Sequence, residues 1–191
     1  IRETAEQRGL LNLKTTPDAM AWLLDEKNMS MLIGQGVFSG CSAMTTVTLG
    51  DGLTKLTGVP YTDGYGGSSQ YSDDVDSTGL SYAYANGLFY GCSSLKTINW
   101  GKNITTIGNV AFLNCSALES VTIPDTVTTI GYHAFLGCSN LKVVKIGAKV
   151  TTIGRMAFRA LPNLTKLTFG AKVRDIEQQA FQDCVNLQNF T

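Results

Sequence analysis

The stretch Ile107-Gly-Asn-Val-Ala-Phe112-Leu-Asn-Cys115-Ser-Ala-Leu118-Glu-Ser-Val121-Thr-Ile123 recurs along this chain with the same spacing. Its phenylalanine returns every 23 residues, and one further copy stands ahead of an insertion: Phe38, Phe89, Phe112, Phe135, Phe158 and Phe181. A fixed period in the twenties is typical of a solenoid, in which each repeat forms one coil stacked on its neighbour. The sequence therefore predicts a solenoid over residues 32–191, with the phenylalanines aligned as an internal spine.

Three apolar columns follow each phenylalanine. They are Met44, Leu95, Leu118, Leu141, Leu164 and Leu187; then Val47, Ile98, Val121, Val144, Leu167 and Phe190; then Leu49, Trp100, Ile123, Ile146 and Phe169. One polar residue separates the second column from the third, and apolar-polar-apolar alternation is typical of a strand. Stacked coils should join these strands into a parallel sheet, with all three columns inward.

A second extended segment is expected in each coil. After a turn marked by glycine or proline comes a second apolar pair, such as Val127 with Ile130, and the two residues between are usually threonines. This composition favours short strands on another side of the coil. The stretch Ala-Phe-x-x-Cys-x-x-Leu has helix-like spacing but spans barely two turns, so we expect a short 3₁₀ or α turn there.

The repeated Ile-Pro, Val-Thr-Thr-Ile-Gly, Ala-Phe, Gly-Cys and Ser-Leu phrases closely resemble the BspA-like leucine-rich repeat family. The resemblance is clearest from Phe89 to Leu187, and residues 33–59 add an imperfect copy. It implies an α/β solenoid, a right-handed leucine-rich-repeat superhelix with stacked short parallel strands and short helical or 3₁₀ turns. It also implies a secreted or surface protein, bacterial or protozoan, with several members implicated in adhesion. The family has no catalytic motif, so no functional residue transfers by matching.

The bulk composition sets further bounds. The chain has 191 residues, 43% of them apolar, and a formal net charge of zero, so nothing draws the whole chain to nucleic acid. It has no run of about 18 apolar residues, so we expect no membrane insertion. The chain begins at Ile1 without a visible signal peptide and stops at Thr191 within an expected strand, so we interpret it as a piece of a longer protein.

Each of the five cysteines stands three residues after a spine phenylalanine: Cys41, Cys92, Cys115, Cys138 and Cys184. Leu161 fills the same slot in another repeat, so the slot accepts an apolar group, and free cysteine packs as one. Cβ vectors that run parallel in stacked coils are poorly placed for disulfides. We therefore expect buried free thiols. No CxxC pair and only one histidine, His133, are present, so no metal or other cofactor is predicted.

The largest departure from the repeat is an insertion at about 60–88, rich in tyrosine and aspartate. Its candidate ligand-binding residues are Tyr65, Tyr71, Asp73, Asp74, Asp76 and Tyr82. Insertions in solenoids often lie on the binding face, and tyrosine among glycine and serine is typical of recognition loops. The alternative is a flexible loop or a degenerate repeat that covers a coil edge. A calcium loop is a poor match, because Ala85 stands where glutamate would be needed.

The second departure is charge. Residues 142–177 carry eight cations against Asp175 and Glu177. Lys145 and Lys166 should point outward from adjacent strands, and Lys149 and Lys172 should share one turn position. Such a cluster would attract an acidic partner, such as a sulfated glycan or an acidic protein. The alternative is that these lysines only keep a long parallel sheet soluble.

Residues 1–31 lack the repeat, and Thr16-Pro17-Asp18 is a good helix start. We expect a helix at about 17–27 that caps the first coil. His133, beside Phe135, is expected to be an exposed bystander. The sequence favours a non-catalytic, extracellular or cell-surface recognition or adhesion module that binds a protein or glycan. The alternative is a structural spacer or accessory domain of a larger secreted protein. Neither an enzyme nor a nucleic-acid partner is expected.

Overall fold

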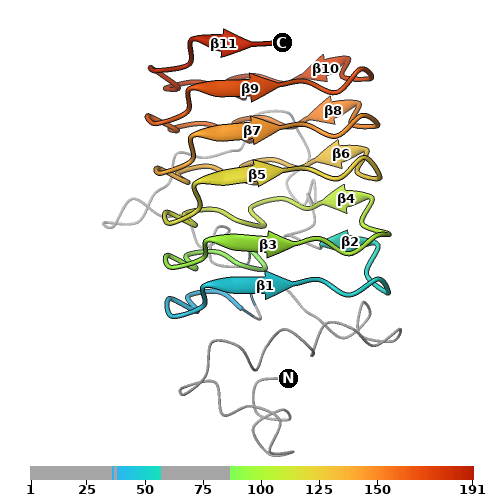
Figure 1. Ribbon diagram of the computed structural model, residues 1–191, viewed down its shortest axis with the longest axis vertical. Coiled ribbons are helices and arrows are strands. Elements are labelled where there is room, and N and C mark those ends of the chain that lie inside the picture. Colours follow the sequence, from blue (N-terminus) through green and yellow to red (C-terminus); the bar gives the residue numbers. More distant parts are fainter. Residues whose placement is uncertain (1–35, 37, 57–86) are drawn as a thin grey trace, which may run out of the picture.

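The computed structural model describes residues 36, 38–56 and 87–191, which form a stack of similar coils (Figure 1). Each complete coil carries two short strands. The first strands of successive coils are β1 (Thr46–Thr48), β3 (Thr97–Asn99), β5 (Ser120–Thr122), β7 (Val143–Lys145), β9 (Lys166–Thr168) and β11 (Asn189–Phe190). The second strands are β2 (Lys55–Leu56), β4 (Thr106–Ile107), β6 (Thr129–Ile130), β8 (Thr152–Ile153) and β10 (Asp175–Ile176).

All strand pairs in the described residues are parallel, as expected. The first strands form a two-stranded sheet, β1-β3, and a four-stranded sheet, β5-β7-β9-β11, while the second strands form one five-stranded sheet. Val144 pairs with Val121 on one side and Leu167 on the other, each 23 positions away. Val47 pairs with Ile98, so the pairing resumes in the same register after the insertion. The predicted parallel-strand solenoid is therefore confirmed.

The phenylalanines form the internal spine. Their rings stack with centroids 5.5, 5.1, 5.2, 5.1 and 5.4 Å apart from Phe38 to Phe181. Neighbouring planes are within 11° of parallel, and the four rings from Phe89 to Phe158 are fully buried. Centroid distances above 5 Å are typical of offset stacking, which aromatic quadrupoles prefer. Trp100 is half-buried and packs edge-on against Phe112 at the margin of this core.

The expected helical turns around the phenylalanines are not seen in the described residues, where these segments are chains of hydrogen-bonded turns. The Cys115 amide donates to the Phe112 carbonyl and the Leu113 amide to the Val110 carbonyl, both three residues back. Val110 and Asn114 lie on either side of Phe112 with φ of 53° and 61°. A right-handed helix needs φ near −60°, so left-handed residues every four positions prevent it from propagating. The α/β character is therefore not supported, and the expected helix at 17–27 lies outside the described residues.

The last coil keeps the predicted columns but not their burial. Phe190 pairs in register with Leu167, yet it is 69% exposed, and Ile176 is 50% exposed. The equivalent residues one coil earlier, Leu167 and Ile153, are buried. Strands β10 and β11 are the edges of their sheets, so these side chains have a coil on one side only in the described structure.

Candidate recognition surface

The outward face of the sheet β5-β7-β9-β11 displays two of the four predicted lysines. Lys145 at the end of β7 and Lys166 at the start of β9 are both exposed. Lys166 lies beside Val143 in the register, and Lys145 lies beside Thr168. The two lysines are therefore diagonal neighbours on one outward face, and the 39% exposed Val143 stands on the same face, in the strand of Lys145 and opposite Lys166.

The other two lysines lie in the turns that follow these strands. Lys149 and Lys172 are both exposed and stand 23 positions apart, so they occupy the same place in adjacent coils. Successive coils in a parallel sheet lie about 4.8 Å apart. The turn lysines thus continue the cationic surface around the corner of the solenoid. We call Lys145, Lys149, Lys166 and Lys172 the lysine cluster.

The ion pairs of the described residues do not involve the lysine cluster. They join Lys102 to Asp51, Lys142 to Glu119 and Arg159 to Asp183, each across neighbouring coils. The hydrogen bond from Lys142 holds the pKa of Glu119 below its usual value, and the Lys102 backbone amide does the same for Asp51. Such exposed pairs contribute little to stability. Within the described residues, the lysine cluster takes part in no ion pair.

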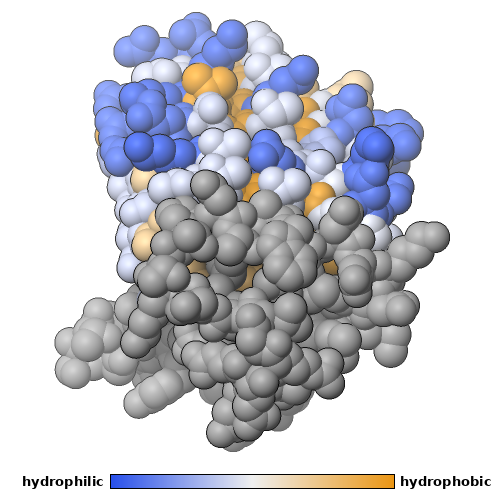
Figure 2. Space-filling model, turned by 60° about the horizontal axis from the view of Figure 1, so that its bottom comes forward, coloured by the Kyte–Doolittle hydropathy of each residue, from blue (hydrophilic) through white to orange (hydrophobic). Residues whose placement is uncertain are grey.

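Figure 2 shows one face of the molecule coloured by hydropathy. On the described part of this face, most strongly hydrophilic side chains gather along the two flanks and at the top, and paler residues lie between them. Ser120 and Thr122 hold the outward positions of β5, so the charges of this sheet come in with β7 and β9.

The insertion candidates lie outside the described residues. Tyr65, Tyr71, Asp73, Asp74, Asp76 and Tyr82 all fall in 57–86, so their placement relative to the lysine cluster stays a prediction.

The cysteines form a ladder of buried donors. Four of them donate to the carbonyl of the spine phenylalanine one coil earlier: Cys92 to Phe38, Cys115 to Phe89, Cys138 to Phe112 and Cys184 to Phe158, at 3.2–3.3 Å from sulfur to oxygen. Cys92, Cys115 and Cys138 are fully buried, which confirms the expectation for the central thiols, whereas Cys41 and Cys184 are half-buried. Burial raises the pKa of Cys92 and Cys138 to about 12 and raises that of Cys115 strongly. These thiols are therefore structural groups with little nucleophilic thiolate.

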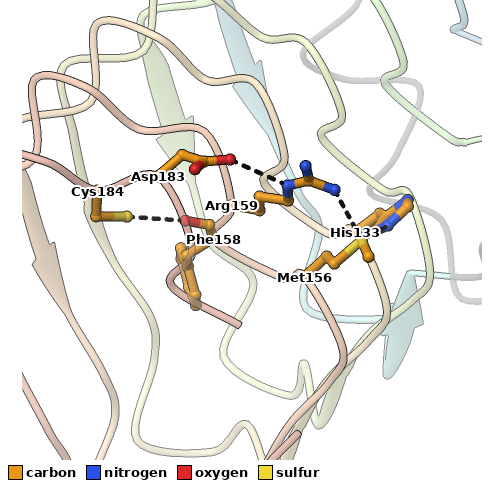
Figure 3. A network of polar contacts seen from close by, with 6 residues as sticks. All are labelled: His133, Met156, Phe158, Arg159, Asp183 and Cys184. Carbon is orange, nitrogen blue, oxygen red and sulfur yellow. Dashed lines mark hydrogen bonds and ion pairs between the residues drawn. The ribbon is translucent and has the colours of Figure 1, made fainter. Parts of the chain in front are cut away.

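His133 is not the exposed bystander that the sequence suggested, because its side chain is only 3% exposed. Its Nε2 lies 2.9 Å from the sulfur of Met156, and Arg159 donates to the same sulfur (Figure 3). Burial first, and then Arg155 and Arg159, lower the pKa of His133 to about 3. Burial and the two arginines therefore hold His133 in its neutral form at ordinary pH.

Some contacts went unpredicted although the repeat contains a signal for them. The Asp125 carboxylate accepts the Ala148 backbone amide at 2.7 Å, and Asp51 accepts that of Lys102 at 2.9 Å. Both acids hold the middle place of a turn, and each binds the next coil, so the column position was informative. The outward valine at Val143 was also missed, although its column otherwise holds polar residues.

Two kinds of feature are absent from residues 36, 38–56 and 87–191. No group of three or more histidine, cysteine or acidic side chains in them is arranged to hold a metal ion. Nor do they include a helix of the length and hydropathy needed to cross a bilayer.

The stacked parallel strands and repeated columns define a leucine-rich-repeat type of solenoid. The sequence matches the BspA type leucine rich repeat region in six copies over residues 83–191. This match covers more than half of the chain, and the chain therefore belongs to the BspA-type leucine-rich repeat family.

Solved structures share the fold. A leucine-rich repeat protein of T. pallidum superposes with a TM-score of 0.60 at 24% identity, over 82% of this chain and 60% of that one. A leucine-rich cell surface protein of Faecalibacterium prausnitzii gives a TM-score of 0.50 at 24% identity, over 78% of this chain and 38% of that one. The chain thus spans less than two thirds of either protein. A search of the curated proteins found no match.

Proposed function

We propose that this chain is a non-catalytic recognition or adhesion module, presented at a bacterial cell surface or secreted, that binds an extracellular protein or glycan. Membership in the BspA-type family supports a surface interaction role. The cell-surface description of the F. prausnitzii protein is consistent with this location.

The observation that carries the proposal is the exposed face of a regular solenoid. Outward positions of β5, β7 and β9 are solvent-exposed across consecutive coils, and the core columns between them are buried. Repeat proteins use such extended surfaces for binding, because side chains there can vary without loss of the core. The lysine cluster is the part of this surface where the repeat alone does not demand the residues that are found.

Catalysis has little support in the described residues. The single histidine of the chain is buried and its pKa is low, and the central cysteines are buried with raised pKa values. A catalytic site needs a nucleophile or base within reach of a partner that activates it. We therefore favour binding over chemistry.

A second reading is a structural spacer or accessory domain of a larger secreted protein. It is favoured by the outward threonine and serine positions, which are ordinary strand chemistry and need no ligand. In that case the lysines serve solubility, and activity lies in another part of the whole protein.

An array of immobilised matrix proteins and glycans, probed with the whole chain and with a variant lacking residues 61–85, separates these proposals. Binding that the deletion abolishes assigns recognition to Tyr65, Tyr71, Tyr82 and the neighbouring aspartates. Binding that survives the deletion assigns it to the solenoid. The absence of any binding by the whole chain contradicts the recognition module and favours the spacer.

A further inference from the structure

The lysine cluster combines regular spacing with a lack of local compensation. Lys145 has Thr122 and Thr168 beside it in the adjacent strands, and Lys166 has Val143 and Asn189. None of these four neighbours carries a charge. The cluster's positive charge is therefore not balanced by the residues in register with it.

The turn positions add a local conflict. Lys149 and Lys172 occupy equivalent places in adjacent coils, where Thr126 holds the place one coil earlier. Like charges at adjacent positions repel and lower stability. A residue choice that opposes the fold without an evident structural gain is expected mainly at functional positions. An anion lying across both coils would attract both lysines and so offset their mutual repulsion.

The chemistry of the cluster separates two kinds of anionic partner. The cores of protein–protein interfaces are enriched in tyrosine, tryptophan and arginine and depleted in lysine. Lysines hold all four positions of the cluster, the exposed Arg174 stands two residues after Lys172, and the exposed Val143 lies opposite Lys166. Lysine is a flexible, strongly hydrated point charge, which suits attraction to densely charged chains better than shape-specific docking of a folded protein.

From these observations we propose that Lys145, Lys149, Lys166 and Lys172 bind a linear sulfated glycan. This assignment rests on the proposed recognition function and names the ligand class for it. The glycan runs along the corner between β7 and β9 and the turns that follow them, so that its sulfate groups meet cations from at least two coils. Binding is dominated by charge and weakens as salt screens it.

The test measures binding of a heparin-derived sulfated oligosaccharide to the whole chain at low and at physiological salt. In one variant, the four cluster lysines are replaced by glutamine: K145Q, K149Q, K166Q and K172Q. The matched control carries K27Q, K55Q, K96Q and K102Q, which removes the same net charge from positions outside residues 142–177. Both variants are first shown by circular dichroism and thermal unfolding to retain the fold.

We expect the cluster variant to bind the sulfated oligosaccharide at least about tenfold more weakly than the parent protein, because it has lost all four charge contacts. The control variant should stay within about twofold of the parent protein, because its lysines lie outside the cluster. Equal loss in both variants would show a mere net-charge effect and overturn the proposal. The proposal would also be overturned if the desulfated oligosaccharide bound as tightly as the sulfated one. Equally tight binding of poly-glutamate would overturn it too and would indicate an acidic protein as the partner.

The experiments distinguish an error in the proposed ligand from an error in the proposed recognition function. If the whole chain ignores the sulfated oligosaccharide but binds a protein on the matrix array, the glycan assignment is wrong and the recognition module stands. If it binds neither, both are wrong.

Discussion

Phe135 has an aromatic ring on each side of it, Phe112 at 5.2 Å and Phe158 at 5.1 Å between centroids. Its own side chain is fully buried. Moving such a ring out of water stabilises the folded state, and the ring also packs against both neighbouring coils. Single substitutions in the spine should therefore lower the free energy of unfolding more than substitutions elsewhere.

Replacement of Phe135 by alanine should lower the free energy of unfolding by about 3–5 kcal/mol, because it opens a cavity between two rings. Chemical denaturation at equilibrium measures this. Phe190→Ala is the matched control, since the same substitution is made where the ring is 69% exposed, and its effect should be small. Similar losses in the two variants would contradict the inward placement of the spine.

The thiols should react in two classes. Cys92, Cys115 and Cys138 are buried and donate to phenylalanine carbonyls, so a thiol reagent at neutral pH should label them only as fast as the coils open. Half-buried Cys41 and Cys184 should react sooner. Mass spectrometry of peptides from a time course distinguishes the classes. Rapid modification of Cys138 in the native protein would refute its placement.

His133 should make the protein sensitive to acid. Its pKa is about 3 in the folded state and about 6.5 in the unfolded chain, so below pH 6.5 the unfolded state binds more protons. Its contribution to stability is therefore present above pH 6.5 and is lost progressively as pH falls toward 3.

The test compares stability at pH 7 and pH 4 in the parent protein and in His133→Met, which copies Met156 in the same column. The variant should lose less stability between the two pH values than the parent. An equal loss in both proteins would show that His133 is not buried as a neutral group.

At the scale of the element, stacking of the coils requires that the backbones of successive turns approach each other closely. A Cβ added to Gly147 would lie 2.1 Å from the carbonyl oxygen of Pro124 in the preceding coil, a distance that no real contact allows. Gly101 and Gly170 are confined in the same way, by Gly50 and Gly147. At Gly101, Gly147 and Gly170 a Cβ is thus excluded by stacking and not by a positive φ, whereas Pro124 holds the same turn position in the coil before Gly147.

Gly147→Ala should therefore destabilise the protein by more than the roughly 1 kcal/mol typical of an ordinary glycine-to-alanine conflict. Gly40→Ala is the comparison, since Gly40 has φ of 71° but no atom within 4 Å of an added Cβ. The loss of stability in Gly40→Ala therefore measures the cost of the backbone conformation alone, without a steric clash. Thermal unfolding of both variants gives the answer, and a Gly147→Ala protein as stable as the parent would show that the coils are not so closely stacked.

Much of each element was readable from the sequence, because column periodicity reports directly on burial. Val121, Val144 and Leu167 were assigned to inward strand positions and are buried there. The expected 3₁₀ or α turns are not confirmed as helices, since the spacing of Phe112, Cys115 and Leu118 fits a helix but says nothing of the backbone angle φ. Left-handed backbone at Val110 is unusual for a β-branched residue, so no local propensity could have indicated it. Interactions across coils impose it.

At the scale of the whole molecule, equivalent positions of successive repeats pair in all three sheets of the described residues, and the same register resumes after the insertion. The candidate surface was predictable only in part. Equal column positions placed Lys149 and Lys172 together correctly, whereas the burial of His133 depends on Met156 and Arg159 from the next coil and could not be read from its own neighbours. The repeat leaves the residues at outward positions unconstrained, so it carries no signal for a ligand.

The most direct test of the stacked-coil account is nuclear magnetic resonance of the protein with labelled phenylalanine rings. Cross-relaxation between ring protons should connect Phe112 with Phe135 and Phe135 with Phe158, whose centroids are 5.2 and 5.1 Å apart, and should not connect Phe112 with Phe158 directly. Rings that show no contact with the ring 23 positions away would contradict the solenoid and everything inferred from its register.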